Sequence, residues 1–132
     1  TNPVGNGSRT AIYCGPSGQI TIEDYVSMSN VTVFSQKEIK IEKNVMIGGG
    51  VQILDSDFHP LQFENRAVND VTKIISKPIL LKQGCFIGAN SIILKGVVIG
   101  ANSIIGAGSV VSKSIPDNEI WGGNPAQFIK NI

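Results

Sequence analysis

The sequence has 132 residues, is 42% hydrophobic and is almost neutral, with eleven Lys and Arg against ten Asp and Glu. This length suits one domain, and a net charge of +1 gives no large field to attract nucleic acid or a membrane surface. Cys14 and Cys85 lie far apart, so neither a disulfide framework nor a zinc site is predicted. We expect a cytoplasmic protein without membrane insertion, because no apolar stretch approaches about 18 residues.

A repeat emerges after a lead-in at residues 1–19, which we expect to be irregular. Ile22 and Met28, with Val26 between them, suggest a first, less regular unit. An aliphatic residue then recurs at every sixth position with a partner four places after it, in the order Ile41, Val45, Ile47, Val51 and Ile53. A helix would need apolar spacings of three and four, so each hexad is predicted to be a short strand and a turn.

The same period returns with greater regularity from residue 81 onward. The large aliphatic residues are Leu81, Ile87, Ile93, Ile99, Ile105 and Val111, and their partners include Ser91, Val97, Ser103 and Ser109. Residues two apart in an extended segment share one face, so large and small side chains are predicted to alternate inward. Gly-Ala-Asn and Gly-Ala-Gly segments between them favour turns. The sequence therefore predicts an all-β chain of stacked hexads.

The residues beside the inward ones face outward but are also apolar, namely Phe86, Ile92, Val98, Ile104 and Val110. Single exposed apolar residues are ordinary, but a repeating set indicates burial against another surface. We therefore expect the chain to associate with other copies of itself.

The hexads are interrupted at about residues 56–79, and stacked repeats place such insertions on one face, often the binding face. The only histidine, His59, stands six residues after Ile53, where the next inward residue would fall, and Pro60 prevents regular continuation. A histidine titrates near pH 6.5 in its ordinary state, which suits a general base. Asp55 and Asp57 are candidates to orient the ring or contact an acceptor, although Asp is equally favoured in turns.

The tail also carries a recognisable motif. In Gly-Asn-Pro-Ala at residues 123–126, Asn can cap a helix and Pro suits the first helical position, which predicts a short helix over 125–131 within a tail at 121–132.

Together these features resemble the hexapeptide-repeat acyltransferases, which include galactoside, maltose and serine acetyltransferases and O-acetyltransferases of surface polysaccharides. The segments that carry the resemblance are Ile-Glu-Lys-Asn-Val-Met-Ile-Gly (41–48), Asp-Ser-Asp-Phe-His-Pro-Leu (55–61), the hexads of 87–100 and 105–116, and Gly-Asn-Pro-Ala (123–126). The resemblance implies one domain over 1–132, a left-handed parallel β-helix with three hexads per coil, and a homotrimer with active sites between subunits.

The resemblance also implies a reaction and a set of site residues. An acetyl group would pass from acetyl-CoA, without a metal, to a hydroxyl of a sugar or surface-polysaccharide precursor. His59 would act as base, with Asp57 and Asn30 on the acceptor side, although Met28 aligns better than Asn30 with the asparagine of galactoside-type members. The residues expected to bind the donor are Ala89, Ala107, Ser112, Lys113 and Lys130.

Two other functions stay open. An N-acetyltransferase acting on an amino sugar or a nucleotide-linked amine would share the fold, the donor and the base. A β-helical binding or scaffold module would keep the fold without turnover. A carbonic anhydrase on a similar β-helix would need several histidine ligands for zinc, and this chain has one.

Overall fold

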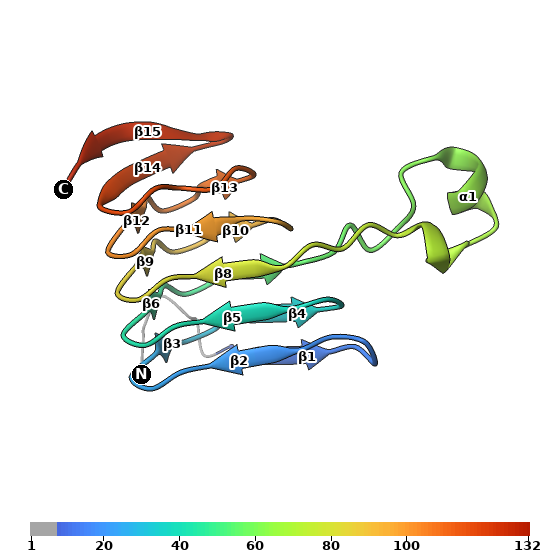
Figure 1. Ribbon diagram of the computed structural model, residues 1–132, viewed down its shortest axis with the longest axis horizontal. Coiled ribbons are helices and arrows are strands. Elements are labelled where there is room, and N and C mark those ends of the chain that lie inside the picture. The colour runs from blue at the N-terminus through green and yellow to red at the C-terminus, as the bar shows by residue number, and fades with distance from the viewer. Residues whose placement is uncertain (1–7) are drawn as a thin grey trace.

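The computed structural model describes residues 8–132 and shows a triangular prism of stacked coils (Figure 1). Successive coils add strands to three parallel sheets, here called A, B and C. Sheet A contains β1 (Ala11–Cys14), β4 (Thr32–Ser35), β7 (Gln52–Leu54), β10 (Ile92–Ile93) and β13 (Val110–Val111). Sheet B contains β2 (Ile20–Ile22), β5 (Ile39–Ile41), β8 (Ile79–Leu81) and β11 (Val98–Ile99). Sheet C begins with β3 (Ser27–Met28), β6 (Met46–Ile47), β9 (Phe86–Ile87) and β12 (Ile104–Ile105).

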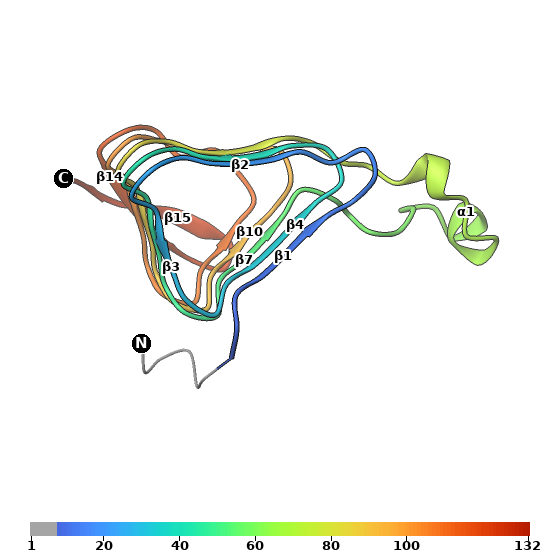
Figure 2. The ribbon, with the colours of Figure 1, turned by 90° about the horizontal axis from the view of Figure 1, so that it is seen from below.

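The coils are left-handed, as the family resemblance implied. Figure 2 looks along the stack from the end that holds β1, and β1, β2 and β3 follow one another anticlockwise as the chain recedes. The expected irregular lead-in is corrected in part, because β1 is a regular strand that pairs in parallel with β4. Its backbone finds partners in the neighbouring coil, which the weak hexad pattern before residue 20 did not reveal. The first seven residues of that predicted lead-in lie outside the described range.

The inward positions form the core as predicted. Every inward aliphatic or serine residue of the regular hexads in 41–53 and 81–111 is at most 3% exposed. Full burial of one such aliphatic side chain stabilises the fold by about 1.5–3 kcal/mol. The inward serines are also satisfied, since the Ser91 hydroxyl donates to the carbonyl of Gly106 at 3.2 Å. The outward set is partly exposed, with Phe86 at 39%.

Turn residues with positive φ recur from coil to coil at two corners of the prism, and Gly96 adds one at the third. At the corner between sheets C and A they are Asn30, Gly50, Asn90 and Gly108, and at the corner between sheets B and C they are Tyr25, Asn44, Gly84, Asn102 and Asn118. Backbone hydrogen bonds join these turns from one coil to the next, as in the 2.7 Å bond from the Gly50 amide to the Asn30 carbonyl. Asparagine and glycine therefore recur in these turns because they tolerate the left-handed conformation.

The insertion leaves the prism at the third corner, between β7 and β8, and projects away from it (Figures 1 and 2). It contains α1 (Phe63–Ala67) and a 3-10 turn, η2 (Val71–Lys73). Its two ends lie side by side, because Ser56 bridges Ser76 in antiparallel fashion. No helix of the described residues is long and apolar enough to cross a membrane.

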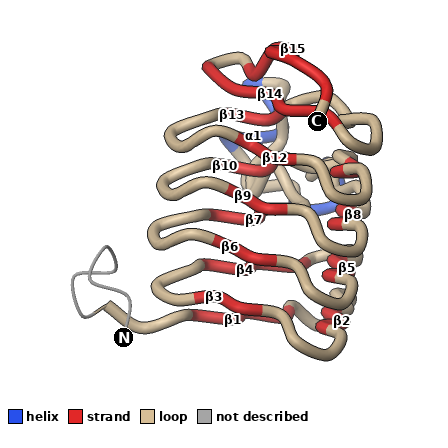
Figure 3. The backbone as a smooth tube through the Cα atoms, turned by 90° about the vertical axis from the view of Figure 1, so that its left-hand side faces the viewer, coloured by secondary structure: helices blue, strands red, loops and turns tan. Residues whose placement is uncertain are grey.

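The predicted C-terminal helix is wrong. β14 (Glu119–Gly123) adds to β12, the chain turns at Asn124 and Pro125, and β15 (Ala126–Asn131) returns antiparallel to β14, so that the hairpin closes the end of the stack (Figure 3). Gly-Asn-Pro suits a reverse turn as well as a helix start. The open edge of β14 offers β15 a complete set of backbone partners, whereas an isolated helix of this length is marginal.

Candidate active site

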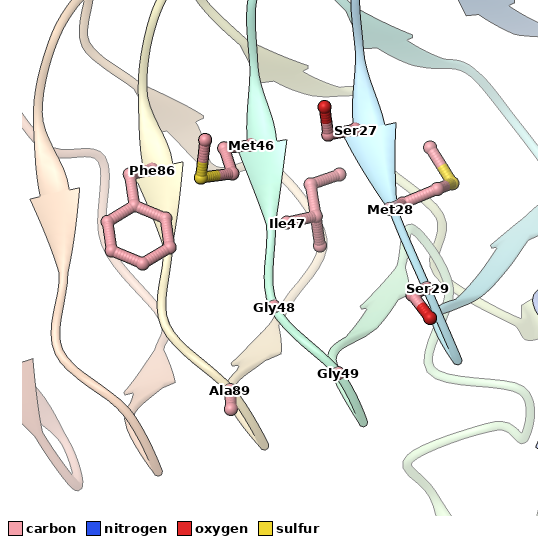
Figure 4. A pocket seen from close by; sticks show the side chains of 9 residues that line it. All are labelled: Ser27, Met28, Ser29, Met46, Ile47, Gly48, Gly49, Phe86 and Ala89. Atoms are coloured by element: carbon pink, nitrogen blue, oxygen red, sulfur yellow. The ribbon is translucent and has the colours of Figure 1, made fainter. Parts of the chain in front are cut away.

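A groove of about 450 Å³ runs over the outer face of sheet C (Figure 4). Its lining residues come from β3, β6, β9 and the turns that follow them: Ser27, Met28, Ser29, Met46, Ile47, Gly48, Gly49, Phe86 and Ala89. The side chains of Met46 and Phe86 lie next to each other on adjacent strands. The groove thus combines a long apolar floor with two hydroxyls and one of the alanines predicted to contact the donor.

The two predicted donor-side alanines stack at the corner between sheets C and A. The Ala89 carbonyl accepts a 2.8 Å hydrogen bond from Gly108, which follows Ala107. The turns are packed so closely that a Cβ on Gly88 would lie 2.5 Å from the Ala107 amide nitrogen. Small residues at this corner let a cofactor approach the backbone.

Asn30 belongs to the same corner as the alanines. Its φ is 56°, so it serves as a left-handed turn residue, and it lies one residue beyond the Met28 and Ser29 that line the groove. Met28 brings a thioether where an asparagine was expected from the resemblance.

His59 is exposed and lies at the start of the insertion, beyond the coil whose spacing it continues by number. The chain leaves the prism after Leu54, and the next buried aliphatic position is filled by Ile79, after the insertion. The backbone on both sides of the imidazole is nevertheless held. Phe58, at φ 64°, packs its ring 4.9 Å from that of Phe34, and buried Pro60 accepts a hydrogen bond from Arg66 at 3.0 Å.

Asp55 is a structural residue, and not a group that faces the imidazole. Its fully buried carboxylate accepts hydrogen bonds from the Ser35 hydroxyl at 2.8 Å and from three consecutive backbone amides, those of Gln36, Lys37 and Glu38, at 2.7–2.9 Å. Asp55 itself lies in no turn, and its carboxylate instead supports a bend of the preceding coil.

Asp57 has a different environment, on the side of the following coil. Its Oδ1 lies 2.7 Å from Nζ of Lys95, and both side chains are largely buried. Nothing in the sequence pointed to Lys95, because the pairing joins residues 38 apart that only the stacking of coils brings together.

The residues predicted for the nucleotide end of the donor divide into two places. Ser112 and Lys113 line a cavity of about 220 Å³ together with Trp121, Gln127 and Phe128 of the terminal hairpin. Lys130 lies elsewhere on β15, in register with Ile120, and is exposed.

The candidate residues of one chain are therefore not gathered in one place. Asp57 and His59 extend from the corner between sheets A and B, whereas Asn30, Ala89 and Ala107 lie at the corner between sheets C and A (Figure 2). Sheet A separates the two corners. Sequence reasoning also missed Met46 as a lining residue, although its outward hexad position, equivalent to that of Phe86, was the available signal.

Comparison with known proteins identifies the architecture. A family model described as bacterial transferase hexapeptide (six repeats) matches residues 78–113. Protein CapG of Staphylococcus aureus is 61% identical over 54 residues, which are 41% of this chain and 31% of CapG. The chain also matches two yeast proteins, one from Schizosaccharomyces pombe and one from Saccharomyces cerevisiae. It spans less than two thirds of the length of CapG and of either yeast protein.

Solved structures extend the likeness over most of the chain. A hexapeptide-repeat acetyltransferase of Vibrio cholerae, in complex with acetyl coenzyme A, is 31% identical with a TM-score of 0.81, over 92% of this chain and 64% of that one. A maltose O-acetyltransferase of Clostridium difficile is 33% identical with a TM-score of 0.66, over 86% of this chain and 67% of that one. The chain therefore belongs to the family of bacterial hexapeptide-repeat transferases.

Proposed function

We propose that this protein is an acetyl-CoA-dependent O-acetyltransferase that modifies a hydroxyl of a sugar or of a surface-polysaccharide precursor. The observation that carries the proposal is the single histidine, whose imidazole is exposed while the backbone on both sides of it is fixed. A base must meet substrate and yet keep its position, and His59 satisfies both needs. Acetyl coenzyme A in the Vibrio cholerae relative supports the choice of donor.

The reaction is a direct transfer in a ternary complex. A neutral hydroxyl is a weak nucleophile, so His59 takes its proton as the oxygen attacks the thioester carbonyl. The new C–O bond forms, the C–S bond breaks, and the proton held on the imidazole passes to the departing thiolate of coenzyme A. General-base assistance of this kind contributes about 10²- to 10⁴-fold.

The donor would lie along the corner of Ala89 and Ala107, where small side chains expose backbone groups to the pantetheine arm. Ser112, Lys113 and Lys130 are the proposed contacts to the nucleotide end, with lysine acting as a point charge for phosphate. Asp57 and Asn30 are the proposed acceptor-side residues.

The separation of the two corners leads us to place the complete site between chains, in a homotrimer. His59 of one subunit would face the alanine corner of its neighbour. The insertion supports such a contact, because it exposes several large apolar side chains that the prism of its own chain leaves uncovered, among them Leu61 at 65%, Phe63 at 69% and Val68 at 76%.

The decisive experiment measures release of free thiol from acetyl-CoA with a panel of sugars and amino sugars, followed by mass spectrometry of the product. Wild-type protein should release thiol with at least one hydroxyl acceptor, and alkaline hydroxylamine should remove the ester formed. An alkali-stable amide would instead identify an N-acetyltransferase.

The matched variants are His59→Ala and His59→Gln, with binding of coenzyme A measured by calorimetry. Both should bind coenzyme A as wild type does and lose at least about 100-fold in turnover. Full turnover in folded His59→Ala would refute the role of the histidine. Failure of the wild-type protein to bind coenzyme A would favour a scaffold module.

A further inference from the structure

Lys95 joins the insertion to the coil that follows it. It lies in the turn after β10, and β10 is the strand stacked directly on β7, from which the insertion departs. Its ammonium is 2.7 Å from Oδ1 of Asp57, with side-chain exposures of 26% and 18%. A charge-assisted contact this short, partly withdrawn from water, is stronger and better defined than an ion pair on an open surface.

The second oxygen of the same carboxylate is the unusual feature. Oδ2 of Asp57 is buried and has no hydrogen-bond partner among the described residues. Asp55 differs from Asp57 in this respect, because its two oxygens accept four hydrogen bonds and the carboxylate stabilises the fold. A buried acceptor without a donor is costly, which indicates that Oδ2 has a partner in the working protein.

The imidazole of His59, two residues further along the chain, carries an N–H that can act as a donor to Oδ2. Asp57 is fixed by its own backbone too, since its amide donates to the Ile75 carbonyl at 3.0 Å. Phe58, between them, is held in the left-handed region with its amide donating to the Ser56 hydroxyl at 3.1 Å. A bulky residue persists in that conformation only where its surroundings demand it, and such residues gather at functional sites.

We propose that Lys95 and Asp57 form a positioning pair for His59. Lys95 holds the Asp57 carboxylate through Oδ1, and Oδ2 accepts the imidazole N–H when the His59 side chain takes its working rotamer. Asp57 then acts on the acceptor side through the histidine and not by direct contact with the acceptor. The other ring nitrogen is then left without a proton and faces the acceptor. A carboxylate that fixes the tautomer of a histidine is an effective means of preparing it as a base. The importance of the pair for turnover rests on the proposed function, but the hydrogen bond itself does not.

The single histidine makes the pair directly observable, because ¹⁵N-histidine NMR of the full chain gives one set of ring signals. Wild type should show one neutral tautomer in excess, because Oδ2 of Asp57 accepts the N–H of one ring nitrogen and leaves the other without a proton. In Asp57→Asn the carboxylate is replaced by a neutral amide, which is a weaker acceptor, so this excess should fall.

Asp70→Asn is the matched control. Asp70 is an aspartate of the same insertion that caps η2 by accepting from Thr72. The tautomer ratio of His59 should be unchanged in this variant. Equal tautomer ratios in wild type and Asp57→Asn would overturn the proposal.

Kinetics test the part played by Lys95. Lys95→Met should lower kcat about tenfold, the usual scale for loss of a supporting contact, without changing KM for acetyl-CoA, and Lys95→Arg should restore most of it. Because the two residues act as one unit, Asp57→Asn/Lys95→Met should be no slower than Asp57→Asn alone. Losses that multiply in the double variant would show that Asp57 acts independently of Lys95 and would overturn the pair.

The outcomes separate this inference from the proposed function. If His59→Ala keeps its activity while Asp57→Asn still changes the tautomer ratio of His59, the pair exists and the proposed base is wrong. If His59→Ala is inactive while Asp57→Asn changes neither the tautomer ratio nor kcat, the base is right and the pair is wrong.

Discussion

At the residue scale, Asp55 and Asp57 have opposite tasks although only Ser56 separates them. Asp55 points into the preceding coil, where three amides and a hydroxyl surround it, and Asp57 points toward the following coil and Lys95. The sequence Asp-Ser-Asp contains no signal for this division. It arises because alternate residues at the mouth of the insertion meet different neighbours in the stack.

Asp55→Ala should lower the free energy of unfolding by about 3 kcal/mol, because three buried backbone amides and one hydroxyl lose a charged acceptor together. Urea denaturation followed by circular dichroism measures the change. Asp70→Ala, which removes the aspartate that caps η2 in the same insertion, should have a clearly smaller effect. Similar losses for the two variants would contradict the structural role of Asp55.

Burial raises the pKa of the Cys85 thiol from its ordinary value of 9.0 to about 12, because the thiolate cannot be solvated in the core. The folded chain therefore keeps a proton that the unfolded chain releases above pH 9, and this contribution to stability is lost as the pH rises toward 12. Between pH 8 and 10.5, wild type should lose about 2 kcal/mol more than Cys85→Ala, as measured by urea denaturation. Equal losses of stability in wild type and Cys85→Ala would show that the folded core tolerates the Cys85 thiolate.

At the element scale, the hexad strands were predictable and the segments that depart from them were not. An inward residue such as Ile93 repeats a spacing that nothing but a stacked strand explains, and it is fully buried. His59 fits the same spacing by number alone, and the chain has already left the coil when it reaches that residue. At the end of the repeat, the structure depends on which strand edge is free to pair. Gly-Asn-Pro forms a hairpin turn because the open edge of β14 pairs with β15.

The site was predictable to a similar degree. Ala89 could be placed in a turn beside sheet C because its position follows from the hexad phase, and it does line the groove. Its contact with the donor, which the family resemblance implied, stays a prediction. The Lys95 partner of Asp57 depends on how the insertion meets the next coil, and no local pattern encodes that contact.

The glycines that follow the inward residues allow a matched test of coil stacking. A Cβ on Gly100 would lie 2.3 Å from the carbonyl carbon of Pro116 and 2.4 Å from the amide nitrogen of Asp117, whereas a Cβ on Gly106 would find its nearest neighbour at 3.7 Å. Gly100→Ala should therefore lower the midpoint of thermal unfolding by several degrees, corresponding to about 2 kcal/mol or more. Gly106→Ala should leave it within about 2 °C, and equal effects would mean that the coils separate easily.

At the scale of the whole molecule, the proposed site needs two chains. Sedimentation should give a particle of about 42 kDa, three times the 14.0 kDa of the chain. A persistent monomer at micromolar concentration would remove the basis for a shared site.

Complementation tests the sharing directly. His59→Ala removes the proposed base, and Ala107→Phe obstructs the corner of Ala89 and Ala107 that is proposed to hold the donor. Each variant alone should therefore be inactive. Subunits mixed by unfolding and refolding should regain about a quarter of wild-type activity, because a site that takes its base and its donor corner from different chains is then intact with that frequency. Mixtures that stay inactive would place both parts in one chain.

The paired ends of the insertion have a consequence for how such proteins can diversify. Asp57 bonds to Ile75, and the amide of Lys77 bonds to the Asp55 carbonyl, so the chain returns to the prism next to the point where it left. β8 then stacks on β5 in unbroken register. The segment between Pro60 and Ile75 can therefore change in length and composition while the coils and His59 remain as they are. Under the proposed function, exchanging this segment as a cassette should alter acceptor preference without loss of the base.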